Sequence, residues 1–234
     1  MSKQNTPSLV VMKSTLSRLP LYYSYISRLQ ADGVESVSSA LLAGHLNLNP
    51  VLVRKDLAQV SSVAGHPRTG FEVKQLLEDM SEYLGYNKMD EAILVGVGSM
   101  GRILLTNTKF AKFGLNIVVG FDKDPYLCGL QLDGKHILPM EKMPSLVQRM
   151  GIRIGIITVP DDQAQSVCDQ MVKAGIKAIW NFAFVPLKVP EDVLVKNENL
   201  PSSLAVLAHK LAMKSPLPKE LNPIIENFRH NRYD

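Results

Sequence analysis

A glycine-rich segment is the part of this 234-residue chain whose residue types and spacing most clearly point to a chemistry. Gly96, Gly98 and Gly101 have the GxGxxG spacing, directly after the apolar run 92–95 and at the start of a predicted helix. In this pattern the first glycine permits a tight turn, the second lets the backbone approach a pyrophosphate, and the third lets helix and strand pack closely. Free amides and the positive helix end then hold the anion. The segment predicts a dinucleotide site.

An acidic residue lies where such a site needs one to hold a ribose. Asp122 follows Gly101 by 21 residues, at the end of the next predicted strand, 115–121. Its carboxylate can accept hydrogen bonds from both ribose hydroxyls and would repel a 2′-phosphate, which favours NAD(H) over NADP(H). Lys123 beside it weakens that preference. The alternative is a Rossmann-like fold that binds another nucleotide, or none.

No general acid or base accompanies this predicted cofactor site. A dehydrogenase needs a His, Lys or Tyr near the nicotinamide, held by an orienting partner. His136, His209 and His230 are in no such arrangement, and the chain is short of a substrate domain. We therefore expect binding without turnover and no catalytic residues. The competing interpretation is a small NAD-dependent oxidoreductase.

Basic residues are concentrated in the first third of the chain. Residues 1–74 contain eight basic and four acidic side chains, whereas the remaining 18 basic and 18 acidic side chains cancel. The whole formal net charge of +4 therefore falls in this third, which indicates a polyanionic partner. An ordinary solvated surface would give the same balance.

The elements that carry these charges are predicted to be helices at 15–30, 37–46 and 50–60. Pro20 is expected near the start of the first helix, where a missing amide is tolerated. Short helices joined by the tight connection 47–49 predict a helix-turn-helix, whose second helix enters the major groove of DNA. The alternative is a small helical interaction domain.

Capping and surface residues support this helix-turn-helix prediction. Ser38 or Ser39 is expected to cap the second helix, and Asn49 the third, with Pro50 at its first position. Arg54 and Lys55 can face outward on the third helix. The glycine- and proline-containing segment 61–71 is expected to form a hairpin or wing carrying His66 and Arg68. Such side chains suit phosphates, and Arg can also read guanine.

Beyond a further helix at 71–86, the pattern changes to short apolar strands alternating with helices, which predicts a Rossmann-like, doubly wound parallel sheet. The predicted strands are 92–95, 115–121, 152–159, 176–182 and 193–195, and the predicted helices are 102–112 and 161–174.

Several classes of protein are disfavoured by composition. No apolar run approaches the ~18 residues that a membrane span needs, and the N-terminus lacks a signal-peptide pattern. Cys128 and Cys168 are too few and too far apart for a disulfide framework or a metal site. We expect reduced thiols, no metal and a cytoplasmic location.

The order of these motifs along residues 14–213 resembles the Rex family of redox-sensing transcriptional repressors. The matching pieces are Arg18-Leu19-Pro20-Leu21-Tyr22-Tyr23, Val53-Arg54-Lys55-Asp56-Leu57, Gly96-Val97-Gly98-Ser99-Met100-Gly101, Thr158-Val159-Pro160, Ala174-Gly175-Ile176-Lys177, Asn181-Phe182-Ala183 and 197–211.

This resemblance implies an α/β homodimer with four parts: a winged helix-turn-helix domain over 1–85, a Rossmann NAD(H)-binding domain over 86–200, a C-terminal helix over 201–215 that swaps onto the partner, and a tail over 216–234. It also implies a repressor that binds double-stranded operator DNA and releases it when NADH binds. No membrane partner is implied.

The resemblance also extends the two sets of expected site residues. The cofactor set is Gly96, Val97, Gly98, Ser99, Met100, Gly101, Asp122, Lys123, Thr158, Val159, Pro160, Asn181, Phe182, Ala183 and Leu200. Leu200 matches the position at which the family inserts an apolar side chain into the partner's nicotinamide pocket. The DNA set is Arg18, Tyr22, Ser38, Ser39, Arg54, Lys55, Gln59, His66 and Arg68.

Three positions depart from the family pattern. Ser24 replaces the usual Arg, Asn107 the frequent Tyr, and Asn199 the usual Asp of a charge-based relay between nicotinamide and DNA domains. The absence of both the Arg and the Asp is physically consistent, because either charge left buried without its partner would destabilise the protein. We expect NAD(H) binding to survive and redox discrimination or coupling to be altered.

The DNA-reading segment also departs from the family. The family's aromatic- and glycine-rich stretch is here 59–64, beginning at Gln59, and the wing is one residue longer. We expect either a different operator or weaker DNA binding. A Rex-like NAD(H) sensor that no longer binds DNA is the alternative.

Overall fold

The computed structural model describes residues 13–66 and 69–214. The chain divides into two compact units, one formed by Met1–Asp90 with Thr108–Asn116 and the other by Glu91–Asn107 with Ile117–Asp234. Arg68 and the predicted tail 216–234 lie outside the described residues.

The first unit is a small helical bundle with a two-stranded sheet. Its buried core is made by apolar side chains of α1, α2, α3 and α4, among them Leu19, Leu42, Leu57 and Leu76. The antiparallel strands join Val37 to Phe71. Its elements are α1 (Lys13–Ala31), β1 (Ser36–Val37), α2 (Ser39–Leu46), α3 (Pro50–Val60), β2 (Phe71–Glu72), α4 (Val73–Leu84) and the 3₁₀ helix η1 (Thr108–Phe113).

The turn between α2 and α3 is formed by local side chain–backbone hydrogen bonds. Ser38 caps α2, its hydroxyl accepting from the Leu41 amide at 3.1 Å. Asn47 ends α2 in the left-handed conformation at φ 53°. Asn49 caps α3, its Oδ1 accepting from the Val51 amide at 2.8 Å. The predicted caps and helix-turn-helix are confirmed, with Ser38 and not Ser39 as the first cap.

Pro20 lies inside α1, because that helix begins at Lys13. The expectation that Pro20 would lie near the helix start, where a missing amide is tolerated, is therefore wrong. Because proline has no amide hydrogen, the Leu16 carbonyl, four residues earlier, receives no hydrogen bond from residue 20. The hydrogen bonds of the neighbouring turns keep α1 continuous.

Two predicted helices have different limits in the structure. Phe71 and Glu72 belong to a strand, so that α4 begins at Val73. The predicted helix 102–112 is divided, because α5 ends at Thr106 and η1 follows it.

The segment 108–116 packs against the end of the first unit. The Asp90 amide donates to the Gly114 carbonyl at 2.8 Å, and the rings of Tyr86 and Phe113 meet edge to face at 5.3 Å. Gly114 has φ +72°, and a Cβ there would lie 2.6 Å from the Lys88 carbonyl oxygen. This close approach requires glycine.

The second unit is a seven-stranded sheet in the order β5-β6-β4-β3-β7-β8-β9, parallel except for the β5–β6 hairpin. The predicted Rossmann-like fold is confirmed. Neither the β5–β6 hairpin nor α6 is among the sequence-based expectations. The elements are β3 (Asp90–Val95), α5 (Ser99–Thr106), β4 (Leu115–Asp122), β5 (Gln131–Leu132), β6 (Lys135–Pro139), the 3₁₀ helix η2 (Met140–Lys142), α6 (Met143–Met150), β7 (Ile154–Ile157), α7 (Asp161–Ala174), β8 (Ala178–Asn181), β9 (Leu194–Asn197) and α8 (Leu200–Lys214).

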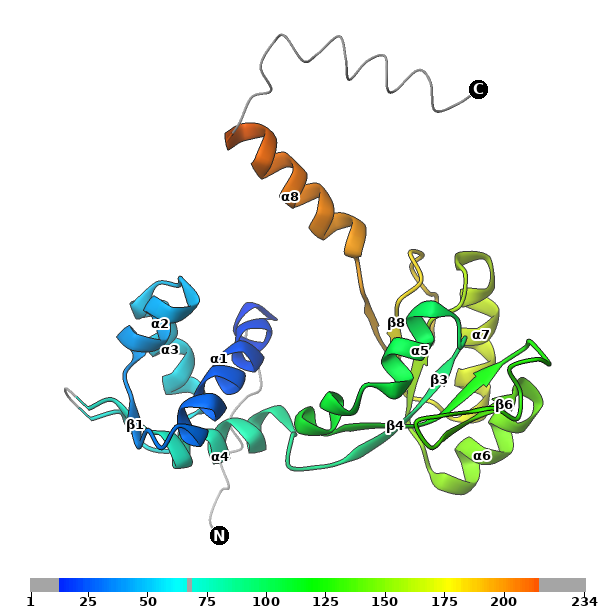
Figure 1. Cartoon of the computed structure of the whole chain (residues 1–234), viewed down its shortest axis with the longest axis horizontal. Coiled ribbons are helices and arrows are strands. Elements are labelled where there is room, and N and C mark those ends of the chain that lie inside the picture. Colours follow the sequence, from blue (N-terminus) through cyan, green and yellow to red (C-terminus); the bar gives the residue numbers. More distant parts are fainter. Residues whose placement is uncertain (1–12, 67–68, 215–234) are drawn as a thin grey trace. The chain divides into compact units, whose positions relative to one another are not determined.

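Helices α6 and α7 pack together against the sheet through buried side chains that include Val147, Val167 and Met171 (Figure 1). Gly120 of β4 leaves room for Leu105 of α5, whose Cδ2 would lie 3.0 Å from a Cβ at that position. Strand β3 lies between β4 and β7 in the sheet. The chain order reverses at this point, where open α/β sheets bind ligands beyond their carboxyl strand ends.

Helix α8 carries an apolar stripe that no other residue of the described ranges 13–66 and 69–214 covers. Leu200, Leu204, Leu207 and Leu211 follow the three- and four-residue spacing of one helix face, and each is about half exposed or more, from 49% to 66%.

Membrane-spanning and metal-binding features are absent from the described part of the chain. None of its helices is long and apolar enough to cross a bilayer, and no three His, Cys, Asp or Glu side chains gather to hold a metal ion. Cys168 is buried, and burial raises the pKa of its thiol to about 11.

Candidate cofactor cleft and nucleic-acid surface

The three glycines of the motif have three different environments, as their spacing predicts. Gly96 turns at φ +96°, and a Cβ there would lie 2.7 Å from Val159 Cγ1. A Cβ on Gly101 would overlap the Gly96 carbonyl oxygen, so α5 could not start so close to β3. Gly98 faces open space, with nothing within 4 Å of a Cβ built on it. A pyrophosphate can therefore approach the backbone at Gly98.

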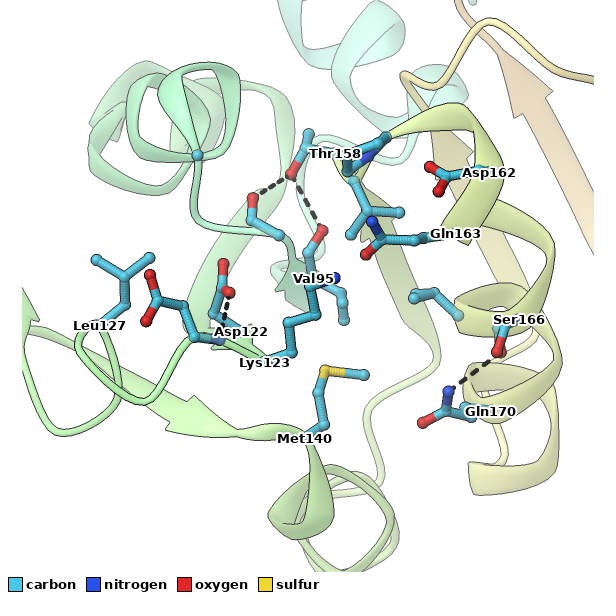
Figure 2. Close-up of a pocket in the computed structure, with 16 residues that line it drawn as sticks. Val95, Asp122, Lys123, Leu127, Met140, Thr158, Asp162, Gln163, Ser166 and Gln170 are labelled. Carbon is cyan, nitrogen blue, oxygen red and sulfur yellow. Dashed lines mark hydrogen bonds between the residues drawn. The ribbon is translucent and has the colours of Figure 1, made fainter.

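The loop is tied to the neighbouring strand by Thr158, which follows β7. Its hydroxyl lies within hydrogen-bond distance of two carbonyl oxygens, 3.1 Å from that of Val95 and 2.7 Å from that of Gly96 (Figure 2). Its amide also donates to the Val95 carbonyl at 2.9 Å. The carboxyl ends of β3 and β7 are thus held together beneath the cleft.

Asp122 is fixed in position by backbone amides. Its Oδ2 accepts from the Val97 amide at 2.6 Å and its Oδ1 from the Asp124 amide at 2.9 Å. Each carboxylate oxygen has a second lone pair, which can accept from a ribose hydroxyl. The first amides of α5, beyond Gly98, have no partner within the helix and can receive phosphate oxygens. The donor and acceptor set therefore fits a dinucleotide.

These groups line a cleft of about 610 Å³ (Figure 2). Seven residues of the expected cofactor set line it: Gly96, Gly98, Asp122, Lys123, Thr158, Val159 and Pro160. The cleft is also lined by nine residues outside the expected set: Val95, Asp124, Leu127, Met140, Asp162, Gln163, Ser166, Val167 and Gln170. The last five form one face of α7, whose start immediately after Pro160 was the available signal.

Some residues of the expected cofactor set lie beside the cleft without lining it. Val97 is buried, and Ser99, Met100 and Gly101 form the start of α5. Phe182 packs on Trp180 with ring centroids 4.8 Å apart.

Asn181 is fully buried, and direct cofactor contact does not fit its position. Its amide nitrogen donates to the Val185 carbonyl at 2.9 Å and to Asn197 Oδ1 at 2.8 Å, and its Oδ1 accepts from the Ala183 amide at 3.0 Å. Asn181 therefore shapes the 181–185 loop. Leu200 lies at the exposed start of α8.

A second groove, of about 700 Å³, lies in the first unit between α2, α3 and the wing. It is lined by four residues of the expected DNA set, Ser38, Ser39, Arg54 and His66, together with Ala58, Ser61, Val63, Ala64, Gly65, Gly70 and Phe71. Lys55 and Gln59 are exposed on α3. Outward-facing basic and polar groups on a recognition helix can reach phosphates and base edges.

Hydrogen bonds fix both ends of the wing. His66 and Gly70 exchange backbone hydrogen bonds of 2.7 and 2.9 Å. Asp79 of α4 accepts from the Ser62 amide at 2.6 Å and from its hydroxyl at 2.8 Å. Burial alone would raise the pKa of Asp79, but the hydrogen bonds from Ser62, Gln75 and Ser61 outweigh it and hold the pKa below its usual value. No local motif in the sequence marks Asp79, which is absent from the expected site residues.

Two residues of the expected DNA set point into the protein. Tyr22 is fully buried, and its hydroxyl donates to Asp56 Oδ2 at 2.8 Å. Direct DNA contact by Tyr22 is excluded in this fold, because its side chain reaches no surface. The Arg18 guanidinium also donates to Asp56, at 2.7 and 2.8 Å.

Known proteins match the chain over nearly its whole length. It is 39% identical to the redox-sensing transcriptional repressor Rex of Bacteroides fragilis over 208 residues, which cover 89% of this chain and 94% of that protein. It is 36% identical to the protein of the same name from Treponema denticola, over 88% of this chain and 96% of that protein. The chain belongs to the Rex family.

Family models and solved structures agree with this Rex assignment. Residues 11–58 match the family described as a putative DNA-binding protein N-terminus, and residues 87–185 match the CoA binding domain. The crystal structure of RSP in complex with β-NAD⁺ and operator DNA is 32% identical, with a TM-score of 0.81, and covers 93% of this chain and 98% of that one. RSP in complex with β-NADH is 33% identical, with a TM-score of 0.78, and covers 88% and 96%.

The three residues that depart from the Rex pattern lie at the start of α8, at the end of α5 and within α1. Asn199 caps α8, its Oδ1 accepting from the Ser202 amide at 2.8 Å. Asn and Asp cap helices equally well, so Asn199 keeps the cap and removes only the charge. Asn107 ends α5, and Ser24 is a partly buried residue of α1.

Proposed function

We propose that this Rex-family chain is a DNA-binding transcriptional repressor that binds NAD(H) and changes its operator affinity with the redox state of the nicotinamide. One observation carries the proposal: a helix-turn-helix with an exposed basic third helix and a dinucleotide cleft of the correct donor geometry occur in one chain. RSP, which has the same fold, was crystallised with β-NAD⁺ and operator DNA together.

The cleft binds the cofactor through three groups. Amides after Gly98 hold the pyrophosphate, Asp122 accepts from the adenosine ribose, and Thr158 with Val159 lies towards the nicotinamide half. Among the described residues, no histidine or tyrosine lines the cleft, and its one lysine, Lys123, directly follows Asp122 at the ribose end, which supports sensing and not hydride transfer. Enzymatic turnover of NADH with a carbonyl substrate would overturn this part of the proposal.

DNA is bound by the first unit. Arg54 and Lys55 contact phosphates or bases in the major groove, Ser38 and Ser39 contact the backbone at the start of α2, and His66 contacts it from the wing. Repression at an operator requires the protein to share a compartment with the chromosome, so a cytoplasmic location is part of the proposal.

The functional unit is a homodimer in which α8 docks on a second copy. Its leucine stripe is exposed in a single chain, and full burial of each leucine contributes about 1.5–3 kcal/mol. Docking of α8 brings Leu200 to the partner's cofactor cleft. A twofold dimer also accounts for a palindromic operator.

Coupling between the two sites follows from linkage. A ligand shifts an equilibrium only through its different affinities for the two states, so NADH must bind the DNA-incompetent state more tightly. Operator DNA must then weaken NADH binding by the same factor. With Ser24, Asn107 and Asn199 in place of charged or aromatic residues, we propose that the difference between NADH and NAD⁺ is smaller here than in relatives with the full relay.

The test begins with selection from random duplex DNA by the full-length protein. The enriched duplex is then titrated with protein, by fluorescence anisotropy, without cofactor and with NADH or NAD⁺. An enriched palindrome that NADH releases supports the proposal. A failed selection with intact NADH binding favours a sensor that acts through protein contacts. A full NADH response at low concentration, with NAD⁺ inert, contradicts the proposed loss of discrimination.

A further inference from the structure

The third helix of the helix-turn-helix has a buried carboxylate on the side away from its basic face. Asp56 is 2% exposed, and it is the one charged side chain buried in the described part of the chain. Arg54 is exposed two positions earlier. Two residues correspond to about 200° around an α-helix, so the two side chains point in nearly opposite directions. Anything that holds Asp56 therefore sets the orientation of the Arg54 face.

Three side chains of α1 hold Asp56. Arg18 Nε donates to Oδ2 at 2.7 Å and its Nη2 to Oδ1 at 2.8 Å, which is the two-pronged geometry of the strongest arginine–carboxylate pairs. The hydroxyls of Thr15 and Tyr22 add bonds of 3.1 and 2.8 Å. This cluster of Thr15, Arg18, Tyr22 and Asp56 is the α1–α3 clamp.

The charges within the clamp cancel. Burial alone would raise the pKa of Asp56, but hydrogen bonds from Arg18, Tyr22 and Thr15 outweigh it and hold the pKa below its usual value. The hydrogen bond to Asp56 raises the pKa of Arg18. Burial and the same carboxylate raise the pKa of Tyr22 to about 12. The clamp is therefore an ion pair at neutral pH and offers DNA no free cation.

We propose that Arg18 is a positioning residue for DNA reading, which sets the register of α3 on α1 through Asp56 and touches no phosphate. This inference rests on the proposed function in DNA binding. It replaces the sequence-based expectation that Arg18 contacts DNA.

The register of α3 on α1 affects contacts with base edges more than contacts with phosphates. Base-edge hydrogen bonds need a fixed geometry, whereas phosphate contacts tolerate small shifts and carry no sequence information. Loosening the clamp should therefore weaken binding to the selected palindrome and leave non-specific binding nearly unchanged. A direct phosphate contact predicts the opposite, since its loss weakens binding to every sequence.

The dependence of affinity on salt separates these two roles. Each phosphate contact adds about −0.9 to the slope of log K against log salt concentration. The test variant is R18Q/D56N, which replaces the ion pair by two neutral amides and leaves the net charge of the chain unchanged. The matched control is R54Q, on the exposed face of the same unit. Full-length variants are titrated against the duplex selected by the wild type and against poly(dI-dC), at four salt concentrations.

The positioning role predicts that R18Q/D56N binds the selected duplex roughly 10-fold more weakly than the wild type, which corresponds to the loss of one good base contact. Its salt slope and its affinity for poly(dI-dC) stay at wild-type values. R54Q should instead reduce the slope by about 0.9 and weaken binding to both DNAs. The conservative R18K, which keeps the charge but not the two-pronged geometry, should recover part of the selectivity.

A reduced salt slope in R18Q/D56N refutes the inference and assigns Arg18 to a phosphate. Wild-type selectivity in folded R18Q/D56N also refutes it, because the clamp would then only add stability. Should R18Q/D56N fail to fold, Y22F replaces it: this variant keeps the ion pair and removes one bond of the clamp, and we expect a smaller loss of selectivity at the same slope. Wild-type protein that enriches no duplex refutes the proposed function itself.

Discussion

Gly98 and Gly101 of the cofactor loop should respond oppositely to substitution by alanine. A methyl group on Gly98 meets nothing within 4 Å, and its backbone at φ −72° suits alanine. G98A should therefore keep the free energy of unfolding or raise it by about 0.4–1 kcal/mol, because alanine reduces the freedom of the unfolded chain. The same methyl group fills the space that a pyrophosphate must enter, so NADH affinity should fall at least about 10-fold, or 1.4 kcal/mol.

Gly101 is the reverse case. A methyl group there overlaps the Gly96 carbonyl oxygen and lies 3.0 Å from Thr158 Oγ1, and neither neighbour is the free end of a flexible side chain. Forcing such an overlap costs about 1–3 kcal/mol. For a chain of this size each kcal/mol lowers Tm by about 2–4 °C. G101A should therefore lose roughly 2–12 °C in Tm as well as NADH affinity.

Thermal unfolding followed by circular dichroism and NADH binding followed by calorimetry measure both effects on the same samples. G98A that binds NADH like the wild type would show that the loop does not hold the pyrophosphate. G101A with an unchanged Tm would show that α5 can move away from β3 at no cost, and the packing argument would fail.

Three further results are expected. D122N should lose NADH affinity but gain affinity for NADPH relative to NADH, because the charge that repels a 2′-phosphate is gone; binding titrations with both cofactors measure this, and an unchanged ratio contradicts it. L204D/L211D should dissociate the proposed dimer, whereas H209D on the opposite face of α8 should not; sedimentation velocity distinguishes them, and equal behaviour of both argues against docking through the leucine stripe. The pKa of Asp56 is lower in the folded than in the unfolded state, so the stability that Asp56 contributes is present above the unfolded pKa and is lost as pH falls through the folded pKa. D56N should therefore lower the free energy of unfolding at neutral pH. Its free energy of unfolding, measured by urea titration between pH 2 and 5, should also depend less steeply on pH than that of the wild type.

Local signals in the sequence predict local structure well. The caps Ser38 and Asn49 act on amides two or three residues away, and the GxGxxG turn is defined within six residues. The position of Asp122 follows from the fixed length of one strand–helix–strand unit. These features need no knowledge of the rest of the chain.

Partners far apart in the sequence account for the failures. Arg18 and Asp56 are 38 residues apart, and nothing near either marks them as a pair, so Arg18 had the appearance of a free cation. Asp79 reaches Ser62 across 17 residues. The α7 wall of the cleft was missed although α7 starts directly after Pro160, because Gln163 and its neighbours come to line the same cleft as Gly96 only in the folded sheet.

The charge pattern also changes when it is counted by folded units. Residues 1–74 carry twice as many basic as acidic side chains, but residues 1–90 carry nine basic and eight acidic ones, because α4 is acidic. The segment 108–116 adds Lys109 and Lys112 to this unit. Counted over both segments, the unit carries eleven basic and eight acidic side chains, so it holds three of the four surplus charges of the chain. Arg54 and Lys55 present two of these basic groups on the exposed face of α3.

The return of residues 108–116 to the first unit also constrains how the chain folds during synthesis. Tyr86 meets Phe113, and the Asp90 amide meets the Gly114 carbonyl, only after β3 and α5 of the second unit have emerged from the ribosome. The DNA-reading unit is therefore completed while the cofactor unit is already forming, and the order of folding is interleaved. A fragment that ends at residue 90 should fold more slowly and unfold faster than the same unit in the full chain.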